Sequence, residues 1–154
     1  MLEQPEAVWK CLSYGSRLGA DPGTVKLGGM DADEEDLINI ENLVIAACGT
    51  SYYASHYGSQ LMREFGCFSV IDVMIASEIQ PKDFPHKNAG LLCVSQSGET
   101  TDVLKPFREA GDRGIKRFNI VNNVESSLAR EAQCGVFVNA GKEISIASTK
   151  AYLC

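Results

Sequence analysis

The sequence predicts an α/β fold built as a three-layer, doubly wound parallel sheet with helices on both faces. From residue 43 onward, five apolar runs of strand length alternate with helix-like patterns. Several of these runs are apolar at nearly every position, which is typical of parallel strands covered on both faces. The regular exchange of strand and helix indicates βαβ crossovers. A chain of 154 residues is long enough for one such domain.

The first 42 residues differ from the rest. Pro5 suits the first turn of a short helix that we expect from Pro5 to about Leu12. Several glycines follow, and the acidic run 31–36 opens a second expected helix that reaches Asn42, since negative residues favour a first helical turn. We therefore expect residues 1–42 to be a linker with lead-in helices and residues 43–154 to form the domain.

The core elements follow from the hydrophobic pattern. Apolar residues recur on one face of 51–65 and again on one face of 101–112, so we expect amphipathic helices there. Strands are expected at 43–47, 68–75, 91–94, 118–121 and 136–138.

Composition excludes several classes of function. The net charge is −6 and no run of Lys or Arg occurs, so we expect no nucleic-acid partner. No apolar stretch approaches the ~20 residues of a membrane span, and the N-terminus lacks the apolar centre of a secretion signal. We therefore expect a cytoplasmic location and no membrane partner. The six cysteines are scattered without a C-x-x-C pair, so we expect free structural thiols and no metal site.

Three hydroxyl-bearing stretches follow strands or precede helices: CGTS at 48–51, SQSGET at 95–100 and ASTK at 147–150. Ligands of open parallel sheets bind beyond the carboxyl ends of the strands. Backbone N–H groups and hydroxyls from these stretches can converge on one anion such as a phosphate, without an arginine clamp. Alternatively, each stretch is an ordinary helix N-cap. The residues alone leave both interpretations open.

Other catalytic motifs are missing. No G-x-G-x-x-G follows a strand, and the segment 135–142 lacks the spacing of a P-loop. His56 and His86 are interpreted as surface residues, and Glu78 and Glu99 form no convincing acid/base pair. The sequence therefore assigns no catalytic residue.

A resemblance to the sugar isomerase (SIS) domain is carried by CGTS, SQSGET and ASTKAY together with EQPEAV, IASE and NNVESSLARE. It extends over nearly the whole chain and is most specific to the first SIS repeat of the glutamine:fructose-6-phosphate aminotransferase (isomerizing) family, also called glucosamine-6-phosphate synthase. The resemblance implies a flavodoxin-like SIS fold. It also implies a homodimeric full-length enzyme that makes glucosamine 6-phosphate from fructose 6-phosphate and glutamine, without a metal or cofactor.

The resemblance also implies a substrate-binding site, carried over by position. The phosphate of the hexose is held by the SQSGET and CGTS stretches, and the ASTK stretch contributes toward the sugar. The residues implied are Thr50, Ser51, Ser95, Gln96, Ser97, Thr100, Ser148 and the backbone at Ile146. Where the family commonly reads GPEIGVASTKA, this chain reads GKEISIASTKA, and the loss of a glycine at Ser145 is expected to stiffen or reposition that loop.

Family enzymes also carry a glutaminase domain and a second SIS repeat, to which the catalytic glutamate, lysine and histidine belong. We therefore expect a fragment, C-terminally incomplete, that leaves apolar sheet surface uncovered and turns nothing over by itself. Three alternatives remain: a regulatory SIS module that senses sugar phosphates, a stand-alone phosphosugar isomerase with its own base, and a flavodoxin-like domain without a sugar ligand.

Overall fold

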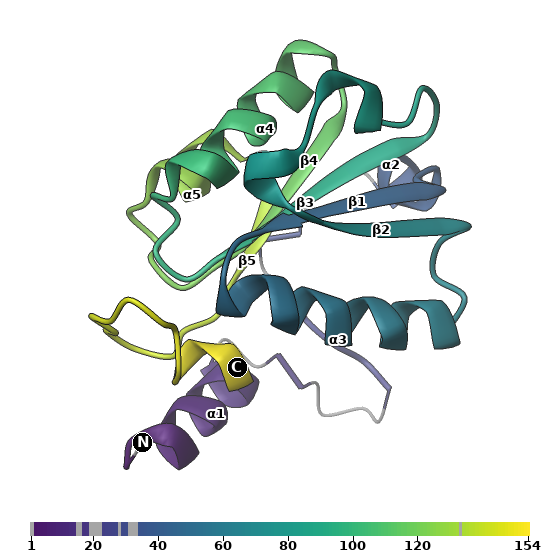
Figure 1. Ribbon diagram of the computed structural model, residues 1–154. Coiled ribbons are helices and arrows are strands. Elements are labelled where there is room, and N and C mark those ends of the chain that lie inside the picture. The colour runs from purple at the N-terminus through teal and green to yellow at the C-terminus, as the bar shows by residue number, and fades with distance from the viewer. Residues whose placement is uncertain (1, 15–16, 19–22, 28, 31–33, 133) are drawn as a thin grey trace.

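A five-stranded parallel sheet forms the centre of the computed structural model, which describes residues 2–14, 17–18, 23–27, 29–30, 34–132 and 134–154 (Figure 1). The strand order is β2-β1-β3-β4-β5, and every neighbouring pair is parallel. The elements are α1 (Gln4–Ser13), α2 (Glu34–Ile38), β1 (Asn42–Ala47), α3 (Thr50–Glu64), β2 (Val70–Ile75), η2 (Ala76–Glu78), η3 (Pro81–Asp83), β3 (Ala89–Ser95), α4 (Thr101–Asp112), β4 (Lys116–Val121), α5 (Ser127–Glu131), β5 (Cys134–Phe137) and η4 (Ala151–Leu153). The predicted doubly wound α/β fold is confirmed.

The five predicted strands and the two predicted core helices are all present, with small shifts at their ends. The strand expected from residue 68 begins at Val70, and the one expected to reach residue 138 ends at Phe137. The short helix α5 was not predicted. It begins after Ser126, whose Oγ accepts a hydrogen bond from the backbone N–H of Ala129 at 3.3 Å.

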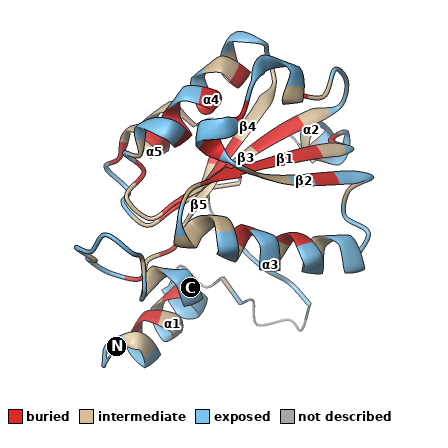
Figure 2. Cartoon of the chain, in the orientation of Figure 1, coloured by how far each residue is buried: buried red, intermediate tan, exposed pale blue. Residues whose placement is uncertain are grey.

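Apolar side chains leave the central strands toward both faces of the sheet. In β1, Val44 and Ala46 belong to the large cluster beneath α4, whereas Leu43 and Ile45 pack on the opposite face with Met62 of α3. Figure 2 shows the buried strands between these helix layers. The continuous apolar runs therefore reflect burial on two faces, as the pattern predicted.

The face of the sheet that carries α3 is covered incompletely. Leu92, Val94 and Ile120 are only half-buried, and all three line a cavity between α3 and η4. The expectation that a C-terminally incomplete fold leaves apolar sheet surface uncovered stays a prediction. Within the part of the chain that the structure describes, no helix is both long and apolar enough to cross a lipid bilayer.

The N-terminal segment departs from the prediction. Of the helix expected to run from residue 31 to Asn42, residues 31–33 lie outside the described residues, and α2 ends at Ile38. The extension to Asn42 is wrong, because Asn42 is the first residue of β1 and its backbone N–H donates to Asn88 O at 3.0 Å. The hydrogen bond to Asn88 requires an extended backbone at Asn42. The acidic pattern at the start of the helix carries no information about this distant partner.

Helix α1 matches the short helix that Pro5 predicted, but its tertiary contacts were not indicated by the sequence. It buries Ala7 and Cys11 in a small cluster with Val138, Ala140 and the C-terminal turn (Figure 1). The two ends of the chain therefore lie side by side.

Phe107 tests the contribution of the main core. It is fully buried in the cluster beneath α4, so Phe107→Ala is expected to lower the free energy of unfolding by about 3–5 kcal/mol, because it removes buried apolar area and leaves a cavity. Phe65→Ala is the matched control, because Phe65 is 79% exposed and its loss is expected to cost less than about 0.5 kcal/mol. Urea denaturation followed by circular dichroism measures both, and equal losses would contradict the assignment of the core.

Candidate functional site

The loops after β1 and β3 leave the sheet at the same edge. In the strand register Ala47 lies opposite Val94, so the CGTS loop emerges directly beside Ser95. The chain passes from β1 into α3 on one face and from β3 into α4 on the other face (Figure 1). Adjacent strands whose connections run to opposite faces form a topological switch point, where open parallel sheets bind their ligands.

A cavity of about 510 Å³ extends from this edge between the sheet and α3. Its size lies within the range of about 300–1,000 Å³ that is usual for small-molecule sites. Of the eight predicted site residues, four line it: Ser51, Ser95, Gln96 and Ser148. The other four, Thr50, Ser97, Thr100 and Ile146, belong to the same loops but do not line the cavity.

Neutral groups dominate this cavity. Its wall is mainly apolar and includes Ile45, Leu92 and Val94 of the sheet. Among the described residues that line it, none is an aspartate, glutamate, histidine, lysine or arginine. An anion at this edge would therefore meet hydroxyl, amide and backbone donors, without the charge of a basic side chain.

The SQSGET loop is folded by its own hydroxyls. Ser95 Oγ accepts a hydrogen bond from the backbone N–H of Gly98 at 3.0 Å, and Ser97 Oγ accepts one from Glu99 N–H at 3.2 Å. Because both oxygens act as acceptors in these bonds, each hydroxyl keeps its O–H to donate to a ligand. Thr100 stands at the N-cap of α4 without a side-chain capping bond.

The CGTS loop starts α3 in a similar way. Gly49 stands at the N-cap with φ 58° and ψ −133°, a conformation that residues with a Cβ rarely adopt. Thr50 and Ser51 occupy the first turn, and α3 has no side-chain capping bond. Gly49 and Thr100 therefore occupy the N-cap positions of α3 and α4 without a side-chain capping bond, whereas the Ser126 hydroxyl caps α5.

Helix α5 supports the SQSGET loop through hydrogen bonds. The Gly98 carbonyl accepts a hydrogen bond from Leu128 N–H at 3.1 Å, and Glu99 Oε1 accepts one from Ser127 N–H at 2.7 Å. Hydrogen bonding to Ser127 lowers the pKa of Glu99. The Glu99 carboxylate is thus engaged in holding the loop, and sequence reasoning had left this role open.

The ASTK stretch reaches the same cavity through Ser148. Its hydroxyl donates to Glu143 Oε2 at 3.1 Å, and Gln96 Nε2 donates to the Glu143 carbonyl at 3.3 Å. The Ile146 side chain is fully exposed. Because the prediction for Ile146 concerned its backbone, that role stays a prediction.

Asn122 and Glu143 hold the segment that leads into the ASTK stretch, and sequence reasoning assigned a role to neither. Asn122 Oδ1 accepts a hydrogen bond from Ala140 N–H at 2.8 Å, and its Nδ2 donates to Gly141 O at 2.7 Å. The available signal for Asn122 was its position directly after the strand predicted at 118–121. Glu143 has no comparable signal, because its partners form a set only in the folded loop.

The candidate acid/base residues do not meet at the cavity. His56 is exposed on α3 with its ring edge against Tyr52, 4.6 Å between centroids, and Glu78 and His86 are exposed elsewhere. All six cysteines are free, as predicted, and burial raises the pKa of Cys93 far above its usual range. The described residues contain no group of three or more side chains suited to hold a metal ion.

Comparison with known proteins gives a consistent result. Residues 36–154 match the SIS domain family. The chain is 38% identical over 153 residues to glutamine–fructose-6-phosphate aminotransferase (isomerizing) 2 of Mus musculus, covering 99% of this chain and 22% of the relative. It is 39% identical over 151 residues to the corresponding aminotransferase of Clostridium acetobutylicum, covering 97% of this chain and 24% of the relative.

A solved structure shares the fold. The C-terminal domain of glucosamine-fructose-6-phosphate aminotransferase from Francisella tularensis superposes with a TM-score of 0.84 at 33% identity, over 98% of this chain and 41% of that one. The chain therefore spans about a quarter or less of the length of the curated relatives described above, and under half of this structure.

Gly98→Ala tests the close packing of the SQSGET loop against α5. A Cβ at Gly98 would lie 2.5 Å from Ser126 Cβ, and Gly98 has φ 67°. Gly114→Ala is the matched control, since Gly114 has φ 71° but open space around its missing Cβ.

The control substitution is expected to cost about 1–2 kcal/mol for the positive φ. Gly98→Ala should cost ~1–3 kcal/mol more because of the overlap with Ser126. In the double variant Gly98→Ala/Ser126→Gly, the loss of the Ser126 side chain should recover part of that excess cost. Thermal and urea denaturation of the three variants measure these differences. Equal destabilisation of the two alanine variants would contradict the close packing of Gly98 on Ser126.

Proposed function

The chain belongs to the SIS domain family, and we propose that its loops after β1 and β3 bind the phosphate group of a hexose phosphate. Ser148 and the backbone at Ile146 would contact the sugar. The phosphate-binding residues proposed are Thr50, Ser51, Ser95, Gln96, Ser97 and Thr100.

One observation carries the proposal. Helices α3 and α4 begin at neighbouring loops of the switch point, and the hydroxyls of those loops are not spent on capping either helix. Uncapped helix starts offer free N–H groups and a positive dipole end to an anion. Hydroxyl donors beside them complete a phosphate site that needs no basic side chain, which suits a chain with a net charge of −6.

We infer further that the chain forms the first SIS repeat of a glutamine:fructose-6-phosphate aminotransferase. Such an enzyme would make glucosamine 6-phosphate from fructose 6-phosphate and glutamine as a homodimer, without a metal or organic cofactor. The identity to two aminotransferases over almost the whole chain supports this inference. A cytoplasmic location is proposed with it, in line with six free cysteines. The division into a lead-in (1–42) and a domain (43–154) stays a prediction.

The 154-residue chain by itself is proposed to bind but not to catalyse. Proton transfer requires a base within hydrogen-bond reach of the substrate. No described residue that lines the cavity carries a carboxylate or an imidazole, and the carboxylates of Glu99 and Glu143 are engaged by the loops. This arrangement also disfavours a stand-alone phosphosugar isomerase.

The phosphate site is tested by replacing Ser95, Ser97 and Thr100 together with alanine. Each hydrogen bond to a charged group is worth about 1.5–3 kcal/mol, so the affinity for glucosamine 6-phosphate is expected to fall at least ~100-fold. Isothermal titration calorimetry measures the change. The double variant Ser69→Ala/Ser77→Ala is the control, since both serines are exposed and neither lines the cavity. Unchanged affinity in a folded triple variant would contradict the proposed phosphate site.

Lack of turnover is tested with the purified 154-residue chain, fructose 6-phosphate and ammonia. No glucosamine 6-phosphate is expected to form, because no described residue that lines the cavity is an aspartate, glutamate, histidine or lysine. Chromatographic detection of the amino sugar measures the product, with calorimetry confirming that hexose phosphate is bound under the same conditions. Product formation that disappears in His56→Ala would instead establish a base in this chain.

A further inference from the structure

We propose that Glu143 is a positioning residue that shapes the loop 145–151 and thereby makes the site select hexose phosphates over inorganic phosphate. This inference rests on the proposed function. The Glu143 side chain lies outside the proposed phosphate-binding loops. We assign it the role of holding the loop that would contact the sugar.

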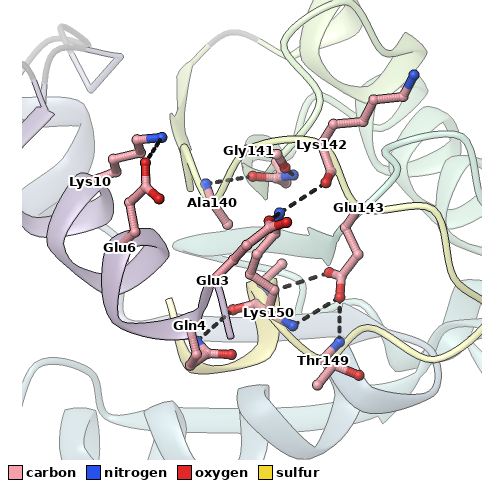
Figure 3. Close-up of polar contacts among 12 residues, drawn as sticks. Glu3, Gln4, Glu6, Lys10, Ala140, Gly141, Lys142, Glu143, Thr149 and Lys150 are labelled. Atoms are coloured by element: carbon pink, nitrogen blue, oxygen red, sulfur yellow. Dashed lines mark hydrogen bonds and ion pairs between the residues drawn. The ribbon is translucent and has the colours of Figure 1, made fainter. Parts of the chain in front are cut away.

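The Glu143 carboxylate gathers the donors of four consecutive residues. Oε1 accepts hydrogen bonds from the backbone N–H groups of Thr149 and Lys150, both at 2.8 Å. Oε2 accepts one from Ala151 N–H at 3.2 Å and one from the Ser148 hydroxyl at 3.1 Å. Figure 3 shows the carboxylate turned toward Thr149 and the Lys150 backbone. The loop therefore closes around an anion that the chain itself supplies.

Charge is essential to this arrangement. Burial acts to raise the pKa of Glu143, but the backbone hydrogen bonds from Lys150, Thr149 and Ala151 and the Ser148 hydroxyl outweigh burial, so the pKa lies below its usual value. An ionised carboxylate is an acceptor only, and four converging donors need an acceptor at every position. A neutral amide of the same shape would place N–H₂ against a backbone N–H.

The same residue connects this loop to the phosphate loop. Gln96 Nε2 donates to the Glu143 carbonyl, so the glutamine that follows Ser95 contacts the backbone of the residue whose side chain holds Ser148. Asn122 secures the start of the segment, and its backbone N–H donates to Gln96 O at 3.3 Å. Ser148 and Gln96 line one cavity, so the distance between phosphate donors and sugar contacts depends on Glu143.

Helix α1 fixes the outer side of the loop. Lys150 Nζ forms an ion pair with Glu3 at 2.8 Å, and the Lys150 carbonyl accepts a hydrogen bond from Gln4 Nε2 at 3.1 Å (Figure 3). Lys150 Nζ also donates a hydrogen bond to Lys142 O at 2.9 Å. The loop is thus held by Glu143 within and by α1 outside.

Glu143→Gln is the decisive variant, compared with Glu143→Asp and with the control Glu64→Gln at the exposed end of α3. If Glu143 merely filled space, the isosteric glutamine would be tolerated. A positioning carboxylate gives the opposite ranking, because aspartate keeps the charge while glutamine introduces a donor.

Two ligands and one ligand-free measurement distinguish the outcomes. For Glu143→Gln, the affinity for glucosamine 6-phosphate is expected to fall about 10-fold or more, whereas that for inorganic phosphate should change less than ~2-fold, because the phosphate loops are untouched. Hydrogen exchange of the amides of 149–151, followed by NMR without ligand, should accelerate. Glu143→Asp should recover part of both effects, and Glu64→Gln should match the parent.

Equal affinity and equal amide protection in Glu143→Gln would overturn the inference, and so would a parallel loss for both ligands. Should the glutamine variant fail to fold, Glu143→Asp provides the comparison with the parent chain, since the shorter side chain keeps the charge but loses part of the set of hydrogen bonds. If the parent chain binds neither ligand, the proposed function and the proposed selectivity both fall. The amide-exchange comparison then still decides whether Glu143 shapes the loop.

Discussion

The parallel register of β1 and β3 sets where the CGTS and SQSGET loops of the candidate site lie. These strands are neighbours in the sheet although β2 separates them in sequence, so the chain leaves them toward opposite faces at one common edge. The starts of α3 and α4 consequently approach the same point from two sides. Without this pairing the two hydroxyl stretches would lie at separate helix starts and could not converge on one ligand.

Contacts within the protein hold the loops at this edge. Gly98 packs on Ser126, Glu99 holds the start of α5, and Glu143 holds the loop that carries Ser148. Donors that are already oriented cost little reorganisation when they replace the water around a phosphate. In this molecule the carboxylates of Glu99 and Glu143 serve as internal acceptors that shape the loops.

Residues far apart in the sequence complete the site. Glu3 at the N-cap of α1 and Gln4 in its first turn contact Lys150, and the contact between Gln4 and Lys150 spans 146 positions of the chain. The cluster of Ala7 and Cys11 beneath them supplies the apolar area that holds α1 in place. The N-terminal helix therefore belongs to the structural support of the ASTK loop, although its sequence reads as a lead-in.

Sequence alone determined the layers of this protein and the composition of its polar loops. Apolar runs identified β1 to β5, periodicity identified α3 and α4, and the hydroxyl stretches marked the edge, because these signals depend on neighbours within one element. The helix predicted to reach Asn42 was wrong, since pairing with residue 88 overrode the local pattern. Only the tertiary structure decided the roles of Asn122, Glu143 and α1, because hydrogen bonds between separate loops depend on strand register and docking, and no local pattern encodes them.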